Sequence, residues 1–305
     1  MIPNGAFAER ARQIGFEKVY IVRPLRLPNA VKGLAADAYE LMPEAKTVIL
    51  LLKTYSAANA SDVNEAVIST YYPASNAAYR MAKRLETELK EKGYRALSNA
   101  QLPLKVYLLR YRIGRQGRNS LVYVDDIGSL FHIQAIITDA EFEYCSSENK
   151  AYDSRMQECL KCGLCEKMCP TGAIKGFAKI EPTRCLRSVS ETNPIPSQYE
   201  KLVGNHLLGC DICQTVCPKN ALHAMSGAYA FPIKKLLTGD ISELKDSIGV
   251  NYARKHRLRM KGITIAANMK RKDLLPELRS IMDSSPDADE KRASERAIYR
   301  LETDT

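Results

Sequence analysis

Residues 159–170 read Cys-Leu-Lys-Cys-Gly-Leu-Cys-Glu-Lys-Met-Cys-Pro, and this stretch decides what the chain folds around. Its four cysteines are separated by two, two and three residues, and the last one precedes a proline. Residues 210–218 repeat this ending, and Cys185 stands well before them as the displaced first cysteine of the second copy. Eight of the nine cysteines in the 305-residue chain therefore belong to two related motifs.

The spacing predicts two 4Fe–4S clusters. Two-residue gaps let thiolates from one tight turn converge on a cubane, and in two-cluster ferredoxins the cysteine before the proline ligates the other cluster. By this rule one cluster is held by Cys159, Cys162, Cys165 and Cys217. The other is held by Cys169, Cys185, Cys210 and Cys213. Zinc sites use C-x2-C pairs and do not require a run of four cysteines ending in Cys-Pro.

Two neighbouring clusters form a path for single electrons. Every assigned cysteine completes a four-thiolate site, so no iron has an open position, and any reactive centre lies elsewhere. Cys145 lies outside both motifs and is predicted to be an ordinary buried cysteine.

The composition is that of a soluble globular protein, with 45% hydrophobic residues. The first twenty residues contain acidic side chains and do not resemble a signal peptide. The most apolar run, Thr47–Leu52, is too short to span a bilayer. We therefore expect a cytoplasmic protein without a membrane partner, in a compartment that keeps thiols free for metal.

The predicted fold class is α+β, in three regions: an α/β cofactor-binding-like domain at 1–145, a ferredoxin-like domain with two 4Fe–4S clusters at 146–225, and a helical C-terminal region at 226–305. Strands are predicted around Val19–Val22 and at Thr47–Leu52, Leu121–Val124 and Gln134–Thr138. An amphipathic helix is predicted over 76–92 and ends before Gly93. Pro276 and Pro286 mark helix boundaries in the tail.

Several segments share a pattern with a known family. Around the cysteines they are Arg184-Cys185-Leu186, Gly204-Asn205 and residues 209–220. Before the cysteines they are Gly117-Arg118-Asn119-Ser120-Leu121 and Gly128-Ser129-Leu130-Phe131, and in the tail they are Lys261 to Asn268. Together they resemble the epoxyqueuosine reductase family, of which the chain is identified as a divergent, shorter member.

The resemblance implies an α/β cobalamin-reductase-like domain, a two-cluster ferredoxin-like module and a short C-terminal helical-repeat region. Members of the family reduce an epoxide on a modified tRNA base, and their clusters pass electrons to cobalamin. The resemblance also implies an electron donor such as a ferredoxin or flavodoxin, and tRNA or another anionic ligand as a partner. The implied cofactor-binding residues are Arg110, Arg112, Gly114, Gly117, Arg118, Asn119 and Ser120.

One segment departs from the family. Its Val-Asp-Thr-x-Pro segment carries an aspartate thought to donate a proton, and the matching stretch here, 98–103, has Ala100 at that position. No Asp or Glu occurs anywhere from 92 to 124. We therefore expect that epoxyqueuosine is not the substrate, or that another group protonates it, and the catalytic residue stays unknown.

Two stretches, 92–124 and 247–272, contain many Lys and Arg residues and no acids, in a chain whose net charge is +10. Interleaved Arg and Tyr in the first stretch suit phosphates and stacked rings. One interpretation is a groove for RNA or for the phosphate-bearing tail of cobalamin. The other is a solvated basic face that complements an acidic electron donor.

Three functions follow from these patterns. The leading hypothesis is an iron–sulfur oxidoreductase that passes electrons to a bound cobalamin, which reduces a small or tRNA-borne substrate. The second is a non-catalytic 4Fe–4S electron-transfer protein that serves a corrinoid or a partner enzyme. The third is an RNA-binding module whose clusters are structural.

The ligand assignment predicts how one cysteine substitution behaves. Reconstituted without oxygen, the native chain is expected to bind about eight irons. Cys217→Ser is expected to damage the cluster otherwise built by Cys159, Cys162 and Cys165, despite its distance in sequence. Iron and sulfide analysis with EPR checks this. Two zinc ions without acid-labile sulfide would contradict the assignment.

Overall fold

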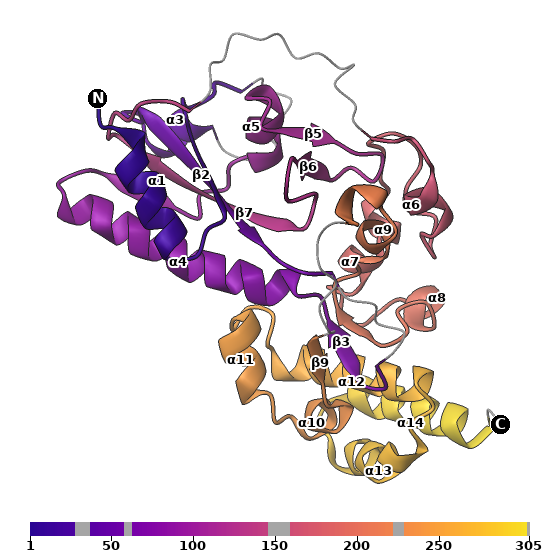
Figure 1. Ribbon diagram of the computed structural model, residues 1–305. Helices are drawn as coiled ribbons and strands as arrows, with labels where there is room; N and C mark the ends of the chain where they lie inside the picture. Colours follow the sequence, from indigo (N-terminus) through magenta and orange to yellow (C-terminus); the bar gives the residue numbers. More distant parts are fainter. Residues whose placement is uncertain (28–36, 58–62, 146–158, 222–228, 304–305) are drawn as a thin grey trace. The chain divides into compact units, whose positions relative to one another are not determined.

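The computed structural model describes residues 1–27, 37–57, 63–145, 159–221 and 229–303. The chain divides into two compact units (Figure 1). Unit 1 is Met1–Tyr55 with Ala74–Cys162, and unit 2 is Ser56–Pro73 with Gly163–Thr305. The predicted boundary near 145 falls inside unit 1, and a short segment of the N-terminal half belongs to unit 2. Among the described helices, none is long and apolar enough to cross a membrane.

Unit 1 is built on an antiparallel sheet with the strand order β1-β2-β7-β4. The strands are β1 (Lys18–Val22), β2 (Thr47–Thr54), β7 (Phe131–Thr138) and β4 (Ala96–Ser98). The apolar run predicted at 47–52 is the buried part of β2, which pairs with β1 on one side and β7 on the other. β7 begins three residues before the predicted Gln134.

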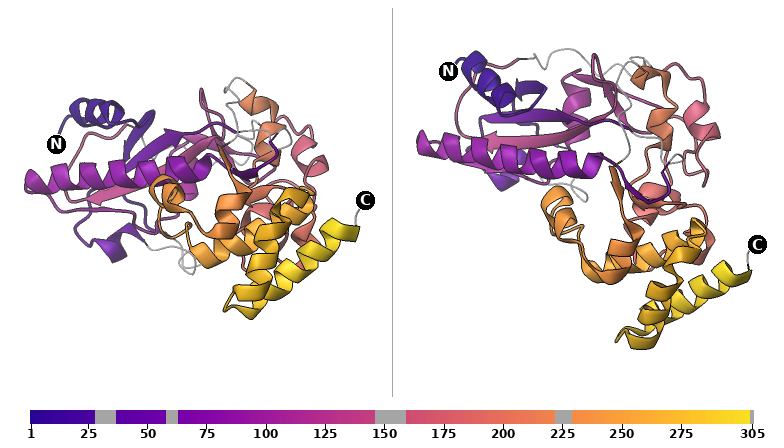
Figure 2. Two further views of the ribbon diagram at one scale, coloured as in Figure 1. Left: turned by 90° about the horizontal axis from the view of Figure 1, so that it is seen from below. Right: turned by 60° about the horizontal axis from the view of Figure 1, so that its bottom comes forward.

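Helices cover both faces of this sheet (Figures 1 and 2). One face packs against α1 (Asn4–Gln13) and α4 (Tyr71–Glu91), through alternate β2 residues such as Ile49 and Leu51. The other face packs against α3 (Ala38–Leu41), α5 (Leu104–Arg110) and the hairpin of β5 (Gly114–Gln116) and β6 (Val122–Val124). The period-two alternation of β2 divides its side chains between the two cores.

Helix α4 starts five residues before the predicted position. Its first turn is stabilised by Ser69, whose Oγ accepts the Tyr71 backbone N–H at 3.2 Å. Gly93, with φ of +86°, follows the helix in the left-handed conformation, as predicted for its end. The predicted apolar stripe is buried at Ala78 and Leu85.

Unit 2 contains a small sheet and the segments that carry most of the cysteines. The sheet has the order β8-β3-β9, from β3 (Ala66–Ile68), β8 (His206–Leu208) and β9 (Tyr229–Phe231). Short helical turns connect the cysteines: α6 (Leu164–Lys167), η2 (Pro182–Arg184), α7 (Leu186–Val189), α8 (Ser197–Glu200), α9 (Ile212–Thr215) and η3 (Pro218–Asn220). Turns this short leave cysteine side chains directed by loops rather than by a continuous helix.

The C-terminal part of unit 2 is helical, as predicted (Figure 2). It contains α10 (Ile233–Thr238), α11 (Ser242–Ile248), α12 (Lys255–Asn268), η4 (Lys272–Leu274), α13 (Leu275–Ser284) and α14 (Ala288–Thr303). Pro276 lies in the first turn of α13 and Pro286 shortly precedes α14, which confirms both boundaries. Gly262 lets α12 approach α10, because an added Cβ would lie 2.8 Å from Leu236 Cβ. The helical repeat itself stays a prediction.

The prediction for Cys145 was wrong, because its side chain is exposed. The core position near it is filled by Phe142, which is 2% exposed and packs edge-to-face on Phe7. The backbone N–H of Cys145 donates to the Ile21 carbonyl at 2.8 Å, and its Sγ lies at the surface, 3.7 Å from Asn4 Nδ2.

Candidate iron–sulfur centre

Six of the eight predicted ligands lie in unit 2, each beside a short turn. Cys165 lies in α6, and Cys169 follows it. Cys185 is the N-cap of α7, Cys213 lies in α9, and Cys217 is the N-cap of η3. Cys210 lies just before α9. All six are partly buried, as expected of thiolates that surround a cluster.

Five of these thiols lie close enough together to influence one another's pKa values. The pKa of Cys210 is raised first by burial and then by Asp211, Cys185 and Cys169, while a backbone hydrogen bond from Ile212 opposes the shift; the resulting pKa is about 12. Burial likewise raises the pKa of Cys213, with further contributions from Cys210 and Cys185. Cys165 of the first predicted set also raises the pKa of Cys213, so the structure brings Cys169, Cys185, Cys210 and Cys213 near one another without separating the two predicted sets.

The surroundings of these thiols fit a cluster. The Cys169 Sγ accepts a hydrogen bond from the Ala173 backbone N–H at 3.3 Å. Burial opposes ionisation of Cys169, but hydrogen bonds from Thr171, Ala173 and Ile174 outweigh it and lower its pKa. Such N–H···S bonds stabilise the charge of cluster thiolates. Cys210 and Cys213, by contrast, stay protonated at neutral pH without a metal, so iron must displace their protons.

The segment before Cys210 is held by a short piece of chain from the N-terminal half. Ser69 Oγ donates to the Asp211 carboxylate at 3.0 Å, and the Ser69 backbone N–H donates to the Leu208 carbonyl at 2.9 Å. Asp211 is 9% exposed, and burial raises its pKa to about 6, against the lowering effects of Ser69 and Arg187. No local sequence pattern predicts these contacts, because they join residues about 140 positions apart.

Both predicted ligand sets stay predictions. Cys159 and Cys162 lie at the end of unit 1, whereas Cys165 and Cys217 lie in unit 2. In the part of the chain that the structure describes, no three His, Cys, Asp or Glu side chains are grouped as ligands of a single metal ion.

The predicted cofactor residues come together in unit 1, around the β5–β6 hairpin. Arg110 ends α5 and is exposed, Gly114 starts β5, and residues 117–120 form the turn of the hairpin. Arg112 and Ser120 have positive φ angles of 53° and 64°, a conformation that costs free energy in a residue other than glycine. A concentration of basic side chains on such a strained hairpin fits an anionic group.

Packing within the hairpin accounts for its two glycines. A Cβ on Gly114 would lie 2.4 Å from Val122 Cγ1, and one on Gly117 would lie 2.4 Å from Tyr123 Cε2. Asn119 Nδ2 donates to the Tyr123 hydroxyl at 3.0 Å and completes the turn. Gly114, Gly117 and Asn119 therefore shape the hairpin, and direct cofactor contacts from them stay a prediction.

Position 100 itself carries no acid, and the carboxylate of Glu86 reaches the chain two residues before it, where it accepts the Ser98 backbone N–H at 3.0 Å. Ala100 is half-buried and packs against the apolar cluster that contains Leu102 and Tyr107. Tyr107 is fully buried, and burial raises its pKa to about 12 although its hydroxyl accepts the Leu25 N–H. The Tyr111 hydroxyl donates to the Arg23 carbonyl at 2.7 Å. The hydroxyl groups of Tyr107 and Tyr111 therefore both form hydrogen bonds with backbone atoms, and both phenols are poorly suited to release a proton to a substrate.

The basic stretch at 247–272 is only partly a surface feature. Arg259 pairs with the buried Glu290 at 3.1 Å, and Arg271 pairs with Glu65 and Asp273 at 2.9 and 2.7 Å. Lys261 is 1% exposed. Both interpretations of this stretch, a groove for an anionic ligand and a solvated basic face, predicted exposed cations, whereas several of its cations are buried or paired within unit 2.

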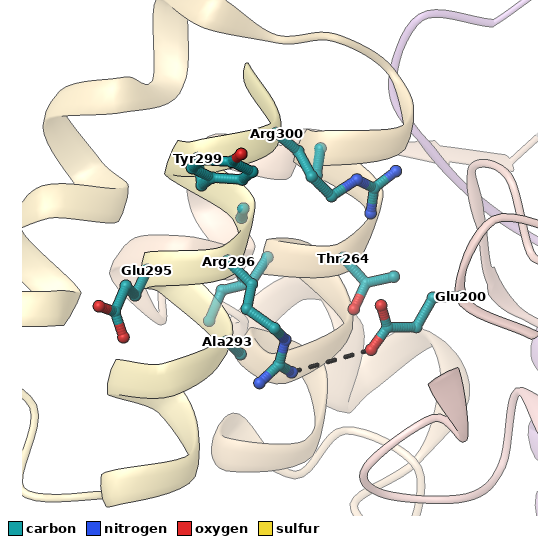
Figure 3. A pocket seen from close by; sticks show the side chains of 10 residues that line it. Glu200, Thr264, Ala293, Glu295, Arg296, Tyr299 and Arg300 are labelled. Atoms are coloured by element: carbon teal, nitrogen blue, oxygen red, sulfur yellow. Dashed lines mark ion pairs between the residues drawn. The ribbon is translucent and has the colours of Figure 1, made fainter. Parts of the chain in front are cut away.

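A pocket of about 410 Å³ lies beside α12 and α14 (Figure 3). Arg296, Tyr299 and Arg300 project from α14, opposite Glu200 and Thr264. Arg296 approaches Glu200 at 3.8 Å, and Arg300 donates to Asn268 Oδ1 at 3.0 Å. Tyr299 is 68% exposed. An exposed ring next to two guanidinium groups can bind a base and a phosphate.

Comparisons with known proteins agree with this centre. Residues 158–220 match a family described as a 4Fe-4S double cluster binding domain. Epoxyqueuosine reductase from Burkholderia pseudomallei is 29% identical over 213 residues, which are 66% of this chain and 52% of that protein. The chain thus spans about half the length of the curated relatives it matches.

Solved structures share the fold. The structure of epoxyqueuosine reductase from Bacillus subtilis superimposes with a TM-score of 0.78 at 23% identity, covering 98% of this chain and 90% of that one. Epoxyqueuosine reductase with a tRNA-Tyr epoxyqueuosine-modified tRNA stem loop gives the same values.

Fold and site together define a protein with a 4Fe–4S double-cluster domain attached to a mixed α and β unit. The resemblance found in the sequence is confirmed by the curated relatives. The chain is similar to curated epoxyqueuosine reductases over about two thirds of its length.

Gly209 tests the link between Ser69 and the cysteines. It has φ of +84°, and an added Cβ would lie 2.6 Å from Ser69 Cβ and 3.1 Å from Tyr72 Cε2. Gly209→Ala should therefore displace Cys210 and lower bound iron by about half, since one of two clusters is lost. Gly204→Ala is the control, because Gly204 also has a positive φ but no atom within 4 Å of the added Cβ. Equal iron contents in both variants would contradict the link.

Proposed function

We propose that the chain is an iron–sulfur reductase of the epoxyqueuosine-reductase type. Its two 4Fe–4S clusters would carry single electrons to a cobalamin held by unit 1. The observation that supports this best is the grouping of Cys169, Cys185, Cys210 and Cys213 within a fold that relatives of this activity share. Because the curated relatives are about twice as long as the matched region, the activity itself is a proposal.

The β5–β6 hairpin is the proposed place for cobalamin. Arg110, Arg112 and Arg118 would hold its anionic tail, and the turn at Asn119–Ser120 would offer polar contacts from an already rigid hairpin. Arg115 is partly engaged, because it pairs with Asp125 at 3.3 Å. A bound cobalamin would supply the reduced cobalt that attacks the substrate. The residues of this chain would bind and orient it.

The substrate is proposed to be small or carried by tRNA. A tRNA would bind mainly through its phosphates. In the α12–α14 pocket, Arg296 and Arg300 could contact phosphates and the exposed ring of Tyr299 could stack on a base (Figure 3). Contacts of this kind depend on charge and weaken as salt rises.

Electrons would come from a one-electron donor protein such as a ferredoxin or flavodoxin. No Gly-x-Gly-x-x-Gly or phosphate-loop motif in the sequence supports a built-in flavin or nicotinamide site. The exposed Leu164 and Met168 lie one turn apart at α6, on either side of Cys165, with the exposed Lys167 between them. An apolar face edged by a cation suits an acidic donor. Such a partner accords with the expected cytoplasmic location.

The hairpin arginines provide the first test of the proposal. The double variant Arg110→Ala/Arg118→Ala should weaken cobalamin binding about tenfold or more, as expected for losing charged hydrogen bonds. Absorbance titration without oxygen measures the affinity, and iron content should stay native. The matched control is Arg84→Ala, an exposed arginine on α4 of the same unit. If the native protein binds no cobalamin, the chain is an electron carrier instead.

Position 100 provides the second test. A placed general acid contributes about 10²–10⁴-fold to such a step, and Ala100, Tyr107 and Tyr111 do not provide one. We expect little turnover of epoxyqueuosine-tRNA by the native protein with clusters and cobalamin bound. Ala100→Asp should raise it slightly, because a carboxyl in this half-buried apolar place would hold its proton more tightly than in water.

Single-turnover assays analysed by mass spectrometry measure this step. Rapid turnover by the native protein would contradict the expectation. The exposed Asp125 and Asp126 would then be the acids to replace with Asn.

A further inference from the structure

Lys261 is a cation inside the core of unit 2. It lies on α12, is 1% exposed, and is among the largest fully buried side chains. Its Nζ donates a hydrogen bond to the Ser190 carbonyl. An ammonium group removed from water loses much hydration, so a buried lysine needs a compensating negative charge or shifts its pKa.

No carboxylate supplies that charge directly. Within the described ranges, no ion pair of 4.0 Å or less involves Lys261. The nearest acidic influence is Glu191, whose carboxylate already accepts the Tyr72 hydroxyl at 2.6 Å, and Arg257 on the same helix opposes the charge. Burial, followed by Arg257, lowers the pKa of Lys261 to about 7 against the raising effect of Glu191. Among the described residues, no carboxylate within ion-pair distance balances the positive charge of protonated Lys261.

Two hydrogen bonds connect Lys261 to the cysteine segments. Ser190 is the residue that ends α7, the short helix whose N-cap is Cys185. The Ser190 Oγ also accepts the backbone N–H of Gly209 at 3.0 Å, and Gly209 directly precedes Cys210. Ser190 is fully buried. Lys261 thus bonds to Ser190 directly, and Ser190 in turn joins the chain segments that present Cys185 and Cys210.

We propose that Lys261 is the buried counter-ion and a positioning residue of the cluster held by Cys169, Cys185, Cys210 and Cys213. A cluster with four thiolate ligands is anionic, and one-electron reduction adds a further negative charge. A positive charge on Lys261 in a low-dielectric core would favour the reduced state more than the oxidised state, so it would raise the reduction potential. The inference rests on the clusters of the proposed function, but not on cobalamin or catalysis.

A purely structural role would not need a charge. The Ser190 carbonyl would be satisfied equally by a neutral amide, which avoids the cost of desolvating an ammonium group. Lysine in this place therefore indicates that the positive charge is itself used. The experiment separates the charge from the hydrogen bond by comparing Lys261→Gln, which keeps a donor, with Lys261→Met, which keeps neither.

The full chain, reconstituted without oxygen, is titrated with redox mediators and followed by EPR. Both variants should lower the potential of the cluster near Lys261, while the other cluster keeps its native potential and serves as an internal reference. Cys185→Ser identifies the signal of the affected cluster. Lys234→Met is the matched control, because it removes an exposed lysine of the same unit and should shift neither potential.

The outcomes are distinct. An unshifted potential in an iron-loaded Lys261→Gln protein would overturn the counter-ion role, and so would an equal shift of both clusters. If the variants lose only this cluster while their circular dichroism without iron matches that of the iron-free native chain, the positioning role is supported. If the iron-free variants are less folded than the iron-free native chain, Lys261 serves the fold alone and the proposal fails. Since the readout needs no cobalamin or substrate, failure of the reductase activity leaves this result unaffected.

Discussion

The structure of unit 2 depends on keeping several thiols together inside a protein. Without metal, the thiols of Cys210 and Cys213 resist ionisation, and the carboxyl of Asp211 between them is itself raised to a pKa of about 6. Iron can bind these thiols only after it displaces their protons, so metal affinity in this segment depends on pH. Because the apolar cluster beside them, around Leu186, Val189 and Val203, is small, iron binding is expected to contribute to the folding stability of the segment.

That requirement explains why distant chain segments meet around the cysteines. Residues 63–73 leave the N-terminal half and join unit 2, where Ser69 holds Asp211 and Asn205 bonds back to Val63 and Glu65. Arg271 reaches the same Glu65 from the helical tail. Short turns cannot fix a cysteine on their own, because they bury little apolar surface. The neighbouring strands and helices therefore serve as the rigid frame for the cysteine loops.

The sequence predicted the local features well. The cysteine spacing, the apolar run of β2, the stripe of α4 and the prolines of the tail are each visible within a few residues, and the structure bears out the elements they indicate. The features missed depend on contacts across long separations. No neighbouring residue in the sequence distinguishes Lys261 from the exposed lysines of the same basic stretch. The sequence also does not reveal that Cys145 is exposed, because only the structure shows that Phe142 fills the core position beside it. The transfer of residues 56–73 to unit 2 likewise has no local signal.

The handling of electrons and the handling of protons are encoded differently in this chain. The proposed electron path depends on a local motif, and the spacing of the cysteines predicts its ligands. Proton donation depends on one side chain in the right surroundings, and here the position expected to carry it holds Ala100 against an apolar cluster. Buried tyrosines near it have their hydroxyls bound to backbone atoms. Under the proposed function, a protein similar to this family can therefore keep the cysteine motifs that deliver electrons while the group that donates the proton changes, because the cysteine motifs and position 100 lie in separate segments of the chain.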